Sequence, residues 1–95
     1  MEKFKVAHIH EQGQDIIIVL VNRSFANKSS TEQGDICSWL QGCARSAGLA
    51  GIVVPVWESG GRLFFLAPPA WLPFFKSLTI QFVQRNINKE LSCSD

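Results

Sequence analysis

The pattern of apolar and polar positions predicts two β-hairpins. Residues alternate from Lys3 to His10, as in a half-exposed strand, and an uninterrupted apolar run follows from Ile16 to Val21. A strand that is apolar on both faces belongs in the middle of a sheet. The second pair of strands, Ile52 to Trp57 and Arg62 to Ala67, flanks Gly60-Gly61. Two adjacent glycines between runs rich in Val, Phe and Trp indicate a tight turn with positive φ.

A helical pattern follows each hairpin. Ser30 and Gln33 form an S-x-x-Q capping box at the start of the first helix, and Gly48 supplies a left-handed stop. Pro68, Pro69 and Pro73 mark the start of the second helix, which we expect from Leu72 or Pro73 to about Leu91. The first helix has an apolar stripe and, opposite it, a face of small residues that favours either close approach of another group or simple exposure. The small residues are Gly34, Ser38, Gly42 and Ser46.

The two halves of the chain show the same order of elements. One shift that places Val6 on Val53 also places Ser30 on Ser77, so we predict two ββα units, residues 3–47 and 50–91, within one domain, residues 1–95. Proline cannot donate to a ladder, so Pro55 indicates that its strand lies at an edge. The predicted fold is therefore α+β: a four-stranded antiparallel sheet, with strands in the order 1-2-4-3 along the chain numbering, and both helices packed on one face.

The predicted second helix has more apolar surface than one sheet can cover. We expect its second apolar side, Ile80, Val83, Ile87 and Leu91, to pack on the sheet. The aromatic side would then form a homo-oligomer interface or one wall of an apolar pocket. The alternative is that the helix kinks, or that the first helix covers these rings, so that all of them are core. The aromatic side comprises Trp71, Phe74, Phe75, Leu78 and Phe82.

The composition favours self-association over binding to nucleic acid or membranes. Of the 95 residues, 18% are charged, below the usual quarter, which leaves little charge to keep copies apart. The net charge is only +1 and the basic residues are scattered, so we do not expect nucleic acid as a partner. The N-terminal residues lack the apolar core of a signal peptide, and no apolar run is long enough to span a bilayer. We expect a cytoplasmic protein.

Few residues suggest reaction chemistry. Cys37, Cys43 and Cys93 make an odd count without C-x-x-C spacing, which favours free thiols in a reducing compartment. His8 and His10 share a strand face and could present two imidazoles to one metal, but no third ligand can be named. The chain has neither a glycine-rich phosphate loop nor a nucleophile elbow. We therefore expect no enzyme, no metal site and no cofactor.

These observations predict a homo-oligomeric protein-interaction module, a dimer in the simplest form. The alternative is a small-molecule binding domain in which an aromatic-lined pocket, formed by Trp57, Trp71, Phe74 and Phe75, encloses an apolar or cationic ligand. The residues expected to form the interface or the pocket are Trp57, Trp71, Phe74, Phe75, Leu78 and Phe82.

Overall fold

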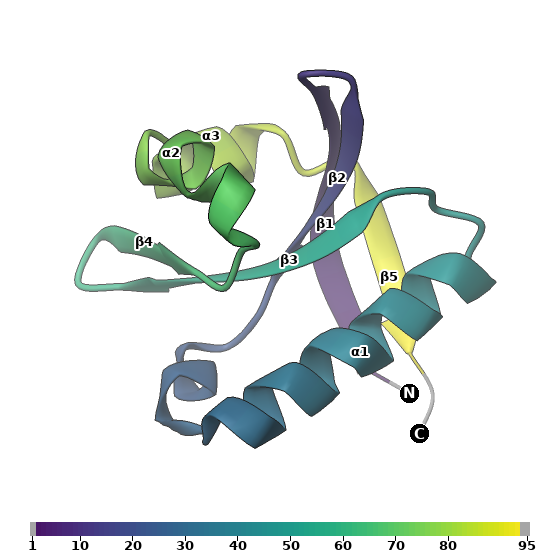
Figure 1. The fold of residues 1–95 in the computed structure, drawn as a ribbon, viewed down its shortest axis with the longest axis horizontal. Coiled ribbons are helices and arrows are strands. Elements are labelled where there is room, and N and C mark those ends of the chain that lie inside the picture. The colour runs from purple at the N-terminus through teal and green to yellow at the C-terminus, as the bar shows by residue number, and fades with distance from the viewer. Residues whose placement is uncertain (1, 94–95) are drawn as a thin grey trace.

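A five-stranded mixed sheet with strand order β4-β3-β2-β1-β5 forms the centre of the protein (Figure 1). The computed structural model describes residues 2–93. Strands β1 (Glu2–Glu11) and β2 (Gln14–Leu20) form the first hairpin, and β3 (Ile52–Ser59) and β4 (Arg62–Phe65) form the second. Strand β3 runs parallel to β2, whereas β5 (Lys89–Cys93) pairs antiparallel with β1. The two hairpins are therefore joined edge to edge through a parallel pair.

Helices cover both faces of this sheet. The 3₁₀-helix η1 (Arg23–Asn27) and the long helix α1 (Ser30–Ser46) connect β2 to β3. Three short helices, η2 (Pro69–Trp71), α2 (Leu72–Lys76) and α3 (Ile80–Arg85), lie between β4 and β5. Figure 1 shows α1 on one side of β3 and the α2–α3 pair on the other.

Two buried clusters lie on opposite faces of the sheet, because successive residues of a strand point to opposite sides. Leu40 and Ala44 of α1 pack on one face, and Phe75 and Val83 of α2 and α3 pack on the other. The strands contribute Val6, Ile17, Val19, Val53, Leu91 and Cys93 to the first cluster and Ala7, Ile16, Ile18, Val54 and Val56 to the second.

The local predictions for the turns and the first helix are largely confirmed. Both hairpins close through residues with positive φ, Gln12 (51°) and Gly13 (77°) in the first and Gly60 (60°) and Gly61 (78°) in the second. Helix α1 has a capping box, although it uses Ser29 and Glu32, one residue before the predicted pair. The left-handed residue after α1 is Gly48, as predicted.

The predicted four-stranded antiparallel sheet is wrong. Strand β3 is internal and β4 is the edge strand, the reverse of the expected order. The N–H and C=O of one strand residue point to the same edge, and the Pro55 carbonyl accepts the Leu66 N–H at 3.0 Å, on the β4 side. The missing N–H of Pro55 therefore faces the place where β4 has just ended, at Phe65. The ladder between β2 and β3 loses nothing, which is why proline is tolerated inside this sheet.

The predicted second helix, residues 72–91, is also wrong. The Ser77 hydroxyl donates to the Phe74 carbonyl at 2.7 Å where α2 ends, and the Thr79 hydroxyl accepts the Phe82 N–H at 3.1 Å to begin α3. Beyond α3, the Asn88 side chain bonds both main-chain groups of His8, at 2.9 and 3.0 Å, and leads into β5. The chain is therefore not two ββα units with helices on one face, and its surplus apolar surface is divided between two short helices and a strand.

The prediction that the cysteines are free thiols is wrong for two of the three. Cys43 of α1 and Cys93 of β5 form a disulfide, with Cα atoms 5.5 Å apart. Cys37 is free and half-buried. The cysteines therefore no longer support a reducing compartment. Separately, no helix within residues 2–93 has the length and apolar character needed to cross a bilayer.

Candidate functional site

Strand β4 has main-chain groups that are free to pair with another strand. Because Trp57 is opposite Phe64 and the Leu66 N–H bonds back to β3, the ladder uses the inward groups of residues 64 and 66. The N–H and C=O of Leu63 and Phe65 then point away from β3. Nothing in the described part of the chain hydrogen-bonds to these outward groups. The outer side of β4 is therefore an open sheet edge.

By contrast, the part of the β3 edge that β4 does not reach is covered. The side-chain amide of Gln41, on α1, donates to the Gly51 carbonyl and accepts the Val53 N–H, both at 3.0 Å. Cys37 adds a weaker thiol contact with the Val53 carbonyl, at 3.9 Å. The Gln41 side chain makes the hydrogen bonds that a neighbouring strand would make and so covers the β3 edge at residues 51–53. An uncovered edge can pair with a strand of another chain.

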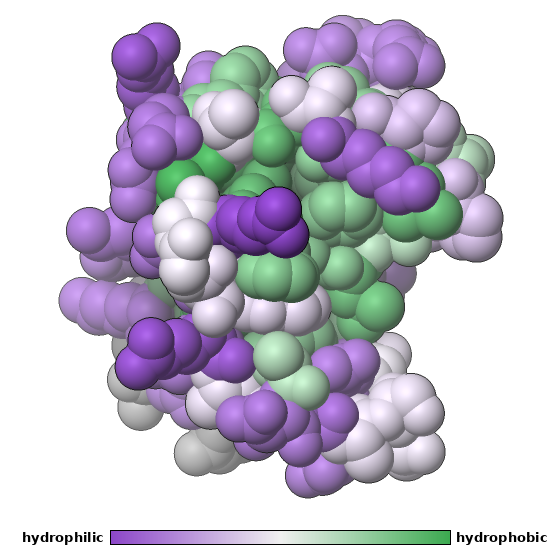
Figure 2. Space-filling model, turned by 90° about the vertical axis from the view of Figure 1, so that its left-hand side faces the viewer, coloured by the Kyte–Doolittle hydropathy of each residue, from purple (hydrophilic) through white to green (hydrophobic). Residues whose placement is uncertain are grey.

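Large apolar side chains stand exposed beside the open edge. Phe64 is 41% exposed and Leu66 37%, and no other large hydrophobic residue among residues 2–93 is as exposed. The Phe64 ring stacks on the Trp57 ring, with centroids 6.2 Å apart. Trp57 is 8% exposed, and its ring centroid lies 5.1 Å from that of Phe25. Figure 2, which views this end of the molecule, shows apolar surface gathered across the middle of the face between hydrophilic borders.

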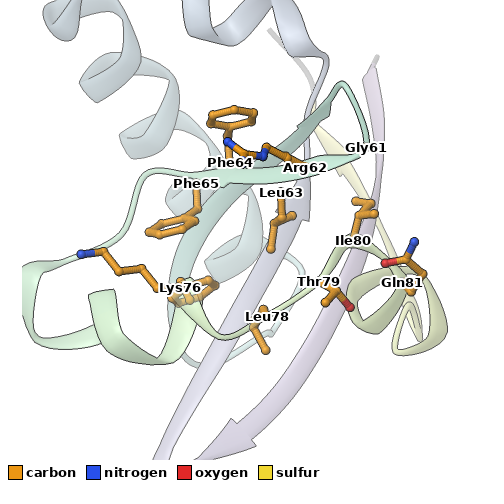
Figure 3. A pocket seen from close by; sticks show the side chains of 11 residues that line it. Gly61, Arg62, Leu63, Phe64, Phe65, Lys76, Leu78, Thr79, Ile80 and Gln81 are labelled. Carbon is orange, nitrogen blue, oxygen red and sulfur yellow. The ribbon is translucent and has the colours of Figure 1, made fainter.

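A groove of about 420 Å³ runs between β4 and the segment that joins α2 to α3 (Figure 3). Leu63 and Phe65 point from β4 toward Leu78, whereas Arg62 and Phe64 point to the other side of the strand. The Phe65 ring contacts the buried Phe75 at 5.4 Å. The groove therefore adjoins the free main-chain groups and has an apolar wall on each side.

The residues predicted for the interface are divided between the two faces of the sheet. Trp71, Phe74 and Phe75 form a chain of ring contacts at 5.6 and 5.2 Å, with Leu78 beside them in the same cluster. Phe75 and Leu78 line the groove, and Phe82 is half-buried on α3. Trp57 lies across the sheet from these rings, on the face that holds Phe25 and Phe64. The structure therefore does not combine Trp57 with Trp71, Phe74 and Phe75 in one pocket.

Sequence reasoning missed the exposed pair Phe64 and Leu66, because it placed their strand in the centre of the sheet. A signal was present in Pro68 and Pro69, which follow the apolar run closely and shorten the strand. A four-residue strand is more typical of an edge than of a centre.

The two histidines on β1 have separate partners. His8 Nε2 lies 2.9 Å from the Ala50 carbonyl, and His10 Nδ1 lies 2.6 Å from Asp15 Oδ1. Within residues 2–93 no three His, Cys, Asp or Glu side chains gather in a way that could hold a metal ion. Burial raises the pKa of the Cys37 thiol, which keeps it protonated and weakly nucleophilic at neutral pH.

Comparisons with models of known families, with curated proteins and with solved structures find no match for this chain. Its function must therefore be inferred from the geometry of its surface.

Proposed function

We propose that this protein is a homo-oligomeric interaction module that associates by strand addition at β4, as a dimer in the simplest case. The observation that supports this proposal is the open β4 edge, where the outward groups of Leu63 and Phe65 lie beside the exposed side chains of Phe64 and Leu66. Exposed apolar edge strands are predicted sites of association. The low fraction of charged residues, 18%, opposes association only weakly.

The second copy fits this edge in an antiparallel register centred on Phe64. In that register Leu63 of one copy lies opposite Phe65 of the other, so both pairs exchange their outward main-chain bonds around a two-fold axis. Arg62, the only charged residue of β4, lies opposite Leu66 of the second copy and meets no like charge. Strand β4 is therefore complementary to itself in both hydrogen bonding and charge.

The same register places side chains on both faces of the new strand pair. Phe64 meets its own copy in a non-hydrogen-bonded pair, where side chains approach most closely, and aromatic pairs of this kind contribute about 0.2–1 kcal/mol. On the other face, Phe65 of the second copy stands beside Leu63, over the groove of about 420 Å³. The groove thus provides space for the side chains that pairing brings together.

The oligomeric state tests the proposal, measured by light scattering and native mass spectrometry over a range of concentrations. Phe64→Lys places like charges opposite each other on the two-fold axis and should give a folded monomer. Ser38→Lys adds the same charge at an exposed position on α1 and should leave the oligomer unchanged.

A main-chain variant separates pairing from side-chain packing. Leu63→Pro removes an outward N–H that the fold does not use, so it should yield a monomer that keeps its circular dichroism spectrum. Phe64→Pro removes an inward N–H of the β3–β4 ladder and should destabilise the fold itself. A wild-type protein that stays monomeric at every concentration, or an oligomer that survives both Phe64→Lys and Leu63→Pro, would refute the proposal.

A second candidate function is binding of a small apolar or cationic molecule. The observation that favours it is a hollow of about 300 Å³ on the α1 side of the sheet, lined by Phe4, Phe25, Ile36 and Trp39, with Glu2 and Lys28 also contributing. Phe4 and Trp39 meet edge to face at 6.0 Å. Native mass spectra of freshly purified protein would show a retained mass, and Trp39→Leu should abolish it.

A further inference from the structure

We infer that the Cys43–Cys93 disulfide is exchangeable, and that a thiolate from solvent attacks it at the Cys43 sulfur. The bond joins α1 to β5, the last strand, and so connects elements that the sheet ladder does not link. The inference is independent of the proposed β4 interface, because β5 and β4 are the two opposite edge strands of the sheet.

The two sulfur-bearing residues differ in their access to solvent. Cys93 is 1% exposed and belongs to the buried cluster with Val6 and Leu91. Cys43 is half-buried and lines a hollow of about 360 Å³ between α1 and β5. An incoming thiolate therefore reaches Cys43 and not Cys93. The hollow is also lined by Ser38, Trp39, Gly42, Ser46 and Ser92.

The small residues of α1 keep this approach open. Gly42 directly precedes Cys43, and a Cβ added at Gly42 would meet no atom within 4 Å apart from its chain neighbours and the backbone of its own helix. Ser38, Gly42 and Ser46 recur at a spacing of four and line one side of the hollow. A larger side chain at Gly42 would enter the hollow that Gly42 and Cys43 both line. Three of the four small residues of this helix face thus border the route to the disulfide.

The exchange is an ordinary displacement at sulfur. The thiolate of an external thiol forms a bond to Cys43 Sγ while the Cys43–Cys93 bond breaks, and Cys93 leaves as a thiolate that takes a proton from water. A second thiol then attacks the external sulfur of the mixed disulfide and releases Cys43 as a thiolate. Two thiols are oxidised to one disulfide as the protein disulfide is reduced to two thiols.

Release of this bond loosens β5. The strand is an edge strand held by its ladder to β1 and by the packing of Leu91. The one ion pair between β1 and β5 within the described residues, Lys3–Glu90 at 3.8 Å, is exposed and adds little. Reduction therefore acts on the attachment of the last strand to the sheet.

Exchange with glutathione tests the inference on the full chain carrying Cys37→Ser, so that only the two paired cysteines react. The folded, oxidised protein is incubated with glutathione, quenched in acid and alkylated, and the modified peptides are identified by mass spectrometry. Glutathione should be found on Cys43 and the alkyl group on Cys93, with a preference of at least about tenfold. Equal modification, a preference for Cys93, or two alkylated thiols before any reductant is added would overturn the inference.

Two glycine variants test the route of attack. Gly42→Leu fills the hollow and should slow exchange several-fold. Gly34→Leu is the matched control, because Gly34 is also an exposed glycine of α1, about two turns away from Cys43. Apart from its chain neighbours and the helix backbone, no atom lies within 4 Å of a Cβ added there. Equal exchange rates for the two variants would show that the hollow is not the route. Hydrogen exchange should increase in residues 89–93 after reduction, and unchanged protection there would contradict the loosening of β5.

Discussion

Reduction of the Cys43–Cys93 bond should lower the stability of the protein by an amount set by the length of chain that it closes. The two cysteines are separated by 50 residues. The chain-entropy relation for a loop of this length gives about 14 cal/mol/K, or about 4 kcal/mol at 25 °C. Domains of this size are commonly stable by only about 5–15 kcal/mol, so the reduced protein should be marginal.

Urea unfolding of the oxidised and reduced forms of the Cys37→Ser protein measures this difference. The comparison removes the crosslink and leaves the rest of the covalent chain unchanged. With an m-value of about 2 kcal/mol/M, the midpoint should fall by roughly 2 M on reduction. The m-value should rise, because the reduced unfolded chain is less compact.

A loss of less than about 1 kcal/mol on reduction would refute this reasoning, since the loop-closure entropy would then not be acting on the unfolded chain. Ile18→Ala provides a control on β2, a strand that the crosslink does not touch. It removes a fully buried side chain and should cost about 2–5 kcal/mol in both redox states, because the packing of β2 does not depend on the crosslink.

Three further predictions concern the α1–β3 side of the sheet. Gly51→Ala should lower the free energy of unfolding by at least about 2 kcal/mol, measured by thermal or urea unfolding. Gly51 has φ of 135°, and an added Cβ would lie 2.6 Å from the Asp15 carbonyl oxygen. By contrast, Gly42→Ala should stabilise α1 by about 1 kcal/mol. Gln41→Ala leaves the Gly51 carbonyl and the Val53 N–H unpaired and should lower the free energy of unfolding by about 2 kcal/mol. The control Gln33→Ala loses one hydrogen bond, to the Phe25 carbonyl, and should cost less. Equal losses of stability would contradict the role of Gln41 in covering the β3 edge. Hydrogen bonds from Ser29 lower the pKa of Glu32 below its ordinary value of 4.5. The wild-type protein should therefore be more stable than Glu32→Gln above pH 4.5, and the difference should disappear as the pH falls through the lowered pKa. A stability difference that persists in strong acid would contradict the capping assignment.

Interactions between residues close in the chain made the local elements predictable. Gly60-Gly61 could be assigned to a tight turn because few other residues adopt positive φ at both positions. The start of the first helix could be located within one residue from its capping pattern. Its end could be located from Gly48, because few other residues adopt positive φ. The strand runs of both hairpins were recognised from their apolar patterns.

The break in the expected second helix was harder to recognise. Its apolar residues satisfied helical spacing from Trp71 to Leu91, and that spacing alone does not reveal a change of direction. The break is marked only by single side-chain hydrogen bonds. Thr79 caps α3, and Asn88 bonds to the main chain of His8, which lies far away in the sequence. A bond of the second kind becomes visible only when the two segments are side by side.

The candidate interaction site was identified in part. Phe75 and Leu78 were among the residues expected at an interface, and both line the groove beside β4. Phe64 and Leu66 were not, because their exposure depends on β4 being the last strand of the sheet. Pro55 suggested the opposite order, since its missing N–H is harmless only at the point where β4 ends.

Backbone preferences and contacts within a few residues were enough to predict the turns, the strands of the two hairpins and the first helix. Long-range packing sets which strands are neighbours, makes β2 and β3 parallel, and brings Cys43 to Cys93. Those features join segments far apart in the chain, and a short apolar strand can satisfy the same pattern at the centre of a sheet or at its edge. The open edge of β4, on which the proposed function depends, is a property of the whole sheet and not of any one segment.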